Sequence, residues 1–118
     1  MLAVVALAYA QTPKGIETHK TDAGDNVLAN SKGMTLYTYD RDKDDKSMCN
    51  GGCASNWPPV EASKGDKDTG DYTVITRDDG SRQWAYDHKP LYTYSKDTKP
   101  GEAAGDGMGN GAWHVAKK

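Results

Sequence analysis

Side chains that bind transition metals are the first feature of this sequence that could do chemistry. Imidazole, thioether and thiolate groups are ligands that copper and zinc take in proteins. No spacing among these residues matches a known ligand set, so a site would need the fold to bring distant positions together. The sequence leaves two interpretations open, a copper or zinc site and ordinary structural histidines. The metal-binding candidates in this group are His88, His114 and Met108.

Three aspartates at alternating positions form a second candidate metal site. Asp40, Asp42 and Asp44 lie in "DRDKDD", which is similar to the opening of a calcium-binding EF-hand loop. The rest of that pattern fails, because Asp45 stands where glycine is required and Gly51 stands where the bidentate glutamate should be. A calcium site is therefore an alternative to a solvated, charged loop.

The only two cysteines, Cys49 and Cys53, lie close together in "MCNGGC". Their Cys-x-x-x-Cys spacing differs from the Cys-x-x-Cys of redox enzymes, so we expect a structural disulfide. In the chain-entropy model, closing so short a loop stabilises a protein by about 2 kcal/mol. Reduction should therefore loosen the loop without unfolding the domain.

No catalytic residues and no organic cofactor are predicted. The chain has no Gly-x-Ser-x-Gly elbow, and "GDGMGNG" lacks the Lys and Ser/Thr of a phosphate-binding loop. Its glycines are better explained by tight turns against Trp113. The balance of 15 basic and 17 acidic side chains gives no preference for polyanions, so nucleic acid is not expected as a partner.

The first ten residues, "MLAVVALAYA", are an apolar run that ends in the small-x-small pattern Ala8-Tyr9-Ala10. This pattern predicts the remnant of a signal peptide over residues 1–10, and hence export to the periplasm or the extracellular space. No cysteine follows Ala10 closely, so we do not expect a lipid-modified N-terminus. No later stretch is long and apolar enough for a transmembrane segment.

The rest of the chain has the length of one domain. Residues 11–25 are predicted to form an N-terminal arm or a loosely held first strand, and residues 26–118 a single β domain. Strands are expected at 26–30, 34–40, 71–76, 82–86, 91–94 and 112–116, separated by turn signals. The predicted fold class is mostly β, a small antiparallel domain of two homologous halves with long Gly- and Asp-rich loops.

An internal repeat supports the two halves. "LYTY" occurs at 36–39 and at 91–94, followed after 17 residues by Trp57 and after 18 residues by Trp113. The half-repeats are placed at 26–60 and 72–116, with a linker at 61–71. Because the chain has no Phe, tyrosines and tryptophans must supply much of the core. We expect Leu36 and Leu91 to face inward, with the tyrosines half exposed and hydrogen-bonded through their hydroxyls.

"LYTYDRD" and "LYTYSKD" both fit the phrase Tyr-x-aromatic-x-x-Asp. Its residues are Tyr37, Tyr39 and Asp42 in the first copy, and Tyr92, Tyr94 and Asp97 in the second. With "NWPP", "DGSRQWAYDHKPLYTY" and "PGEAAGDGMGNGAWHVA", the chain resembles a bacterial family of secreted repeats of unknown function, also described as predicted lipoproteins, over residues 27–115. The resemblance implies an exported repeat protein and no particular activity.

Two functional hypotheses follow from these observations. The first is an exported, non-enzymatic binding or envelope-associated module with an unidentified protein or envelope partner. The second is an extracytoplasmic protein that binds copper or zinc, or a redox accessory protein, using the histidines and nearby Met or Asp side chains. The metal content of protein purified without an affinity tag separates the two.

Overall fold

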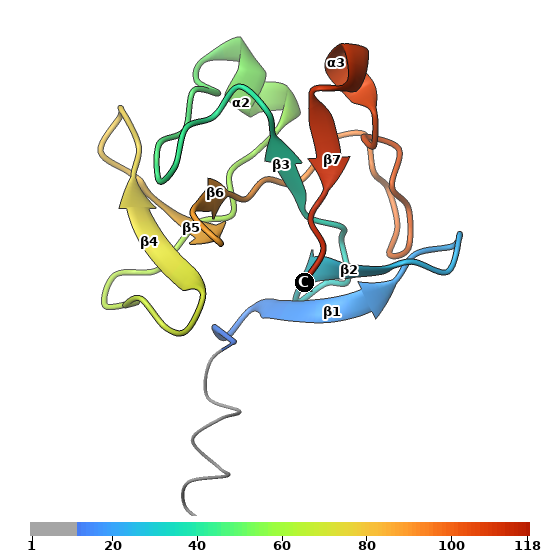
Figure 1. Cartoon of the computed structure of the whole chain (residues 1–118), viewed down its shortest axis with the longest axis horizontal. Coiled ribbons are helices and arrows are strands. Elements are labelled where there is room, and N and C mark those ends of the chain that lie inside the picture. Colours follow the sequence, from blue (N-terminus) through green and yellow to red (C-terminus); the bar gives the residue numbers. More distant parts are fainter. Residues whose placement is uncertain (1–11) are drawn as a thin grey trace, which may run out of the picture.

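The computed structural model describes residues 12–118, so the predicted signal-peptide remnant lies outside the described residues. The mostly β fold and the small antiparallel sheets predicted from the sequence are confirmed (Figure 1). The elements are β1 (Ile16–Lys20), β2 (Asn26–Asn30), β3 (Tyr37–Tyr39), α2 (Gly52–Asn56), β4 (Tyr72–Thr76), β5 (Arg82–Tyr86), β6 (Lys89–Pro90), α3 (Met108–Gly111) and β7 (Trp113–Val115).

Three sheets form from these strands. β1 pairs with β2, β3 pairs with β7, and β4, β5 and β6 follow one another in a meander. The sheet of β3 and β7 joins the two halves of the chain and places Thr38 opposite His114. Within residues 12–118, no helix combines the length and the apolar composition that crossing a membrane requires.

The two halves are related by a pseudo-twofold axis at the point where the "LYTY" segments cross. Tyr37 and Tyr92 exchange both backbone hydrogen bonds, at N···O distances of 2.7 and 3.0 Å. Matching bonds flank this pair: Leu36 N donates to Leu28 O at 2.9 Å, and Leu91 N donates to Trp84 O at 3.0 Å. The same backbone path is therefore followed twice.

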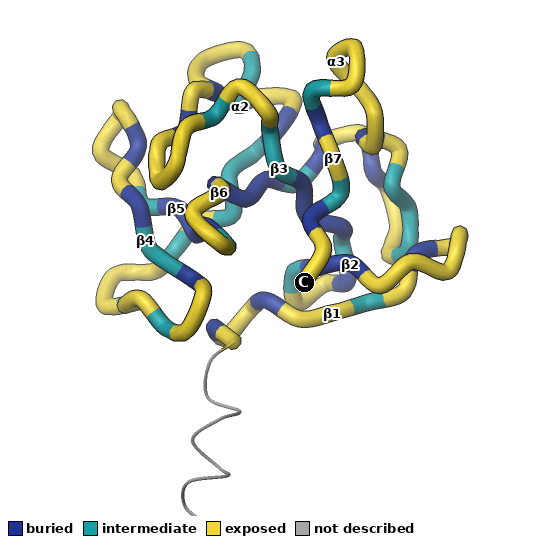
Figure 2. The backbone as a smooth tube through the Cα atoms, in the orientation of Figure 1, coloured by how far each residue is buried: buried dark blue, intermediate teal, exposed yellow. Residues whose placement is uncertain are grey.

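The buried residues form two clusters, and along the backbone they alternate with exposed loops and turns (Figure 2). The first, the mixed cluster, packs aliphatic side chains with two rings: Ile16, Leu28, Leu36, Tyr72, Trp84, Leu91 and Ala116. The second, the aromatic cluster, consists of Tyr37, Cys49, Trp57, Tyr92, Tyr94 and Trp113. Rings thus supply one of the two clusters almost alone.

The expectation that the repeated tyrosines are half exposed is wrong for three of the four. Tyr37 and Tyr92 have no exposed surface and Tyr94 is 7% exposed, whereas only Tyr39 is partly exposed. Leu36 and Leu91 are also fully buried, as predicted. Alternating residues of a strand point to opposite faces, and here each face meets a core of its own.

The second "LYTY" differs from the predicted strand at 91–94. The regular strand of this hairpin is β6, at Lys89–Pro90, and Tyr92 forms single bridges with Tyr37 and Pro59. Tyr92 therefore lies between two segments of the chain, without a continuous ladder on either side. At the other end of the molecule, every residue of β1 pairs with β2, so the first half begins before the predicted start at Asn26.

Two glycines of the C-terminal run allow the chain to approach the tryptophans, which the sequence predicted for Trp113 only. A Cβ atom at Gly105 would lie 2.6 Å from the Trp57 ring, and one at Gly109 would lie 3.1 Å from the Trp113 ring. Gly109 also adopts a φ of +65°, which side chains other than glycine rarely accept. These positions keep the indoles covered.

Candidate functional site

The repeated Tyr-x-Tyr-x-x-Asp phrase joins the two halves by exchanging its side chains. The Tyr37 hydroxyl donates to Asp97 Oδ2 at 2.6 Å, and the Tyr92 hydroxyl donates to Asp42 Oδ2 at 2.6 Å. Each tyrosine therefore binds the aspartate of the other copy. Backbone N–H groups of Met48 and Ala104 donate to the second oxygens of Asp42 and Asp97, respectively.

Burial determines the ionisation of these exchanged pairs. It raises the pKa of both carboxyl groups, while the hydrogen bonds from the tyrosine hydroxyls and from backbone N–H groups partly offset that rise. Burial also raises the pKa of Tyr37 and Tyr92 far above the ordinary value for a phenol, and the hydrogen bond to a carboxylate raises it further. Both phenols stay protonated and act as donors.

These phenols predict a loss of stability at alkaline pH. Burial raises the pKa of Tyr72 to about 12, and the pKa values of Tyr37 and Tyr92 are raised as well. A tyrosine with a raised pKa in the folded protein contributes fully to stability below its pKa in the unfolded chain, which is about 10. This contribution is lost as pH rises further, because the unfolded chain then ionises more readily than the folded protein. The free energy of unfolding should fall above about pH 10, by up to about 1.4 kcal/mol per pH unit for each buried tyrosine.

Urea denaturation at a series of alkaline pH values measures this loss, and phenolate absorbance reports ionisation. If Tyr37 and Tyr92 ionised near about pH 10 while the protein stayed folded, their hydrogen bonds to the aspartate carboxylates would be contradicted.

Four aromatic rings form a continuous stack across the pseudo-twofold axis. Trp57 and Trp113 lie face to face, with ring centroids 3.8 Å apart and planes 2° apart. Tyr39 stacks on Trp113 with its centroid at 4.1 Å, and Tyr94 stacks on Trp57 at 4.2 Å. The two tryptophans therefore have equivalent surroundings, which supports the duplication predicted from the sequence.

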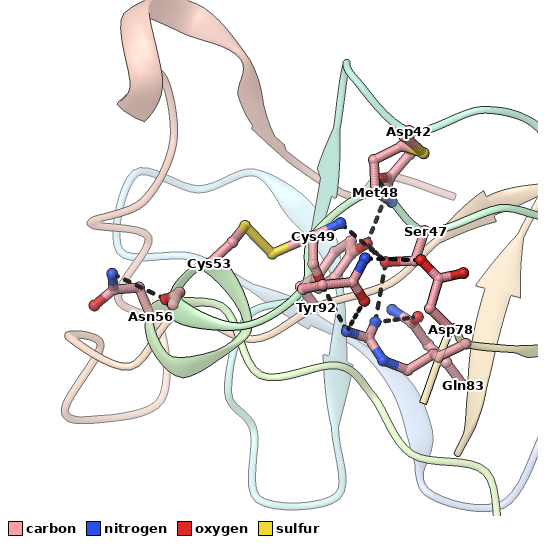
Figure 3. The surroundings of a disulfide bond; sticks show 12 residues. Asp42, Ser47, Met48, Cys49, Cys53, Asn56, Asp78, Gln83 and Tyr92 are labelled. Atoms are coloured by element: carbon pink, nitrogen blue, oxygen red, sulfur yellow. Dashed lines mark hydrogen bonds between the residues drawn. A yellow bond between two sulfur atoms is a disulfide. The ribbon is translucent and has the colours of Figure 1, made fainter. Parts of the chain in front are cut away.

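The predicted disulfide joins Cys49 to Cys53, and it lies beside a polar network (Figure 3). Arg77, which is 5% exposed, donates to Cys49 O, to Ser47 Oγ and to Gln83 Oε1. Ser47 Oγ in turn lies 2.6 Å from the Tyr92 hydroxyl. The bridged loop is thus fixed to the second half through a buried cation.

A polar cleft lies beside β3 and β7 and has a volume of about 390 Å³. Loop residues 40–44 and the β5–β6 hairpin provide part of its lining, and the C-terminal segment provides another part. Tyr39 and Tyr86 contribute rings. Its charged lining residues are Asp40, Asp42, Lys43, Asp44, Asp87, Lys89, His114 and Lys117. This cleft is called the main cleft below.

The candidate metal ligands are only partly brought together. Asp40, Asp42, Asp44 and His114 all line the main cleft, and His114 Nε2 lies 2.8 Å from Asp40 Oδ2. His88 Nδ1 instead lies 2.8 Å from Asp45 Oδ2, and this hydrogen bond raises the pKa of His88. Among the described residues, no three His, Cys, Asp or Glu side chains converge as a metal-binding group.

Met108 lies at the start of α3 and is 44% exposed. Asp42 is occupied by the Tyr92 hydroxyl and by the backbone N–H of Met48, so both of its oxygens already accept hydrogen bonds. Binding of calcium or of a transition metal by Asp40 and Asp44 therefore stays a proposal. The EF-hand-like interpretation of "DRDKDD" lacks the entering helix, because β3 precedes this loop, and only the five-residue helix α2 follows the twelve-residue window, at Gly52.

A second depression, of about 570 Å³, lies at the place related to the main cleft by the pseudo-twofold axis. Thr93, Val60 and Glu61 line it where Thr38, Ala116 and Lys117 line the main cleft. Asp40 corresponds to Ser95 and His114 to Pro58, so the Asp–His pair exists in one half only. The halves therefore share their core but differ in their clefts.

Reasoning from the sequence missed Lys89, Lys117, Tyr86 and Arg77. The first three are brought to the main cleft by folding, and no local spacing predicts this. Arg77 directly follows β4, where a charged side chain ordinarily faces solvent. In an alignment of the two halves, Arg77 corresponds to Thr21. This difference between the copies is the signal that could have identified Arg77.

Comparisons with known proteins agree with the repeat. A family described as a secreted repeat of unknown function matches residues 17–61 and again residues 73–117, which together make up more than half of the chain. No curated protein and no solved structure matches. The two matched ranges coincide with the two halves of the structure, and the exchanged Tyr and Asp residues lie within them. The chain belongs to this family of secreted repeat proteins.

Proposed function

We propose that this protein is an exported, non-enzymatic binding module whose ligand site is the main cleft. The observation that carries this proposal is the difference between the two halves. Tyrosine, tryptophan and aspartate recur at matching core positions, whereas the cleft position of Lys117 is Glu61 in the other copy. The fold does not need different residues there, so a ligand accounts for the difference better than packing does.

The size and lining of the cleft support a small or extended polar ligand. Its volume of about 390 Å³ lies within the range of small-molecule sites. Oppositely charged side chains alternate along the loop from Asp40 to Asp44, and this arrangement offers both donors and acceptors. The imidazole of His114 is bound to Asp40, and no hydroxyl or thiol of the described residues is hydrogen-bonded to it, so the pair lacks a nucleophile.

Binding can be tested by NMR with isotopically labelled protein and mixtures of amines, organic anions, saccharides and short peptides. We expect shifts of backbone signals around Thr38, Lys89 and His114. The matched control is the second depression, reported by Lys32 and Thr93. Shifts confined to the second depression, or no binding by any class of probe, would contradict the proposal.

A metal-binding or redox accessory function is the second proposal, and the contact between Asp40 and His114 favours it. A carboxylate and an imidazole are ligands that zinc and copper share. Elemental analysis of tag-free protein should then give stoichiometric copper or zinc that is lost in His114→Ala, with His19→Ala as the control. Metal-free protein that also fails to take up added zinc, copper or calcium removes this function.

A further inference from the structure

We propose that the main cleft binds a saccharide, with a sugar ring stacked on Tyr39. This inference rests on the proposed function and adds the chemical class of the ligand. The four-ring stack described above ends at Tyr39, which is partly exposed and lines the main cleft. Trp113 covers one face of the Tyr39 ring at 4.1 Å, and no other ring of the described residues covers the opposite face.

The two ends of the stack differ in exposure. Tyr39 is partly exposed and lines the main cleft, whereas Tyr94, at the other end, is 7% exposed and lines neither depression. The face of an aromatic ring carries negative charge and attracts the weakly positive C–H groups on the flat side of a sugar ring. A sugar placed on Tyr39 would therefore continue the stack by one member.

The charges of the cleft favour a neutral, hydroxyl-rich ligand over a charged one. An anion would meet the carboxylates of Asp40, Asp44 and Asp87, and a cation would meet the ammonium groups of Lys89 and Lys117. A hydroxyl group both donates and accepts hydrogen bonds, so a sugar can use acceptors and donors together. Tyr86 and Pro90 add apolar surface beside these groups.

The matching depression lacks this combination. It contains no tyrosine, because Tyr94 is turned into the aromatic cluster, and its ring Trp84 is 4% exposed. The first copy of the motif faces the main cleft and leaves its second aromatic residue, Tyr39, accessible, whereas the second copy buries Tyr94. A saccharide should bind to one half of the molecule and leave the other half unoccupied.

The test measures the binding of two neutral oligosaccharides, chitotetraose and cellotetraose, to the full chain by calorimetry and by NMR. We expect at least one probe to bind and to shift signals around Tyr39. Tyr39→Phe keeps the ring and should retain binding, whereas Tyr39→Leu keeps apolar contact with Trp113 and should weaken binding about tenfold or more. Lys32→Ala, in the second depression, should bind as the unmodified protein does.

A second pair of variants protects the test if Tyr39→Leu disturbs the fold. Asp44→Ala and Lys89→Met remove hydrogen-bonding side-chain groups from exposed positions and should each weaken binding of the same probe. Binding of amines, anions or peptides in the main cleft without binding of either saccharide overturns this inference and leaves the proposed function standing. Saccharide binding outside the cleft overturns it too, and failure of every class of probe overturns both.

Discussion

Trp57→Ala should lower the free energy of unfolding by about 3–5 kcal/mol, and Trp113→Ala should lower it by a similar amount. Each indole is almost completely buried, and each packs against the other and against one tyrosine of the stack. Small domains have only about 5–15 kcal/mol of stability in total, so either change should leave a considerable unfolded population. Urea denaturation followed by circular dichroism measures both variants.

The double variant Trp57→Ala/Trp113→Ala provides the critical comparison. Because the two rings contact each other at 3.8 Å, the first substitution already removes part of what the second would remove. The combined loss should therefore be smaller than the sum of the single losses. Trp57→Phe and Trp113→Phe are the controls for the two single variants, since each keeps a ring and should cost less. Strictly additive losses would mean that the two indoles stabilise the protein independently.

Tyr37→Phe should cost about 1–3 kcal/mol, although only one oxygen atom is lost. Asp97 is 7% exposed and would lose a donor that it cannot replace from solvent. The matched control is Tyr72→Phe: the Tyr72 hydroxyl is buried and has no hydrogen-bond partner within the described residues. Its removal should be neutral or stabilising, because it relieves an unsatisfied polar group.

Coupling measurements test whether the motif is exchanged between the halves. Tyr37→Phe combined with Asp97→Asn should be non-additive, because these side chains form one hydrogen bond. Tyr37→Phe combined with Asp42→Asn, the aspartate of its own copy, should be close to additive. Coupling between Tyr37 and Asp42 that exceeded coupling to Asp97 would show that each copy of the motif closes on itself.

The repeat and most of the strands could be predicted because they depend on local sequence. β-branched and aromatic residues between turn signals indicate strands, and the hairpin turn at Asp87 and His88 adopts the positive φ angles of such a turn. The disulfide followed from the spacing of the only two cysteines. These features need no knowledge of how distant segments pack.

The burial of Tyr37 and Tyr92 could not be predicted from alternation alone. Alternation identifies two faces of a strand, and one face is assigned to solvent by default. Here the two "LYTY" segments pair across the axis and are covered on both sides, so the default fails. The role of Asp42 and Asp97 was hidden for the same reason, because each aspartate meets its tyrosine from the other copy.

The main cleft was beyond prediction because its lining comes from separate parts of the chain. Lys117 lies near the C-terminus and Asp40 follows β3, yet both reach the same cavity. The sequence did identify Asp40, Asp42, Asp44 and His114 as candidates, and the structure places all four at this cleft. It could not indicate which of their oxygens are already used, and Asp42 turned out to be needed by Tyr92.

The exchange of tyrosine and aspartate also bears on how such a domain could arise. A lone copy would present Tyr37 without an acceptor and Asp42 without a donor, and it could satisfy both only by meeting a second copy as a symmetric homodimer. Joining the copies in one chain makes that encounter intramolecular, at an effective concentration set by the residues between them. Fusion therefore frees the two surfaces to diverge, which no homodimer of identical subunits can do.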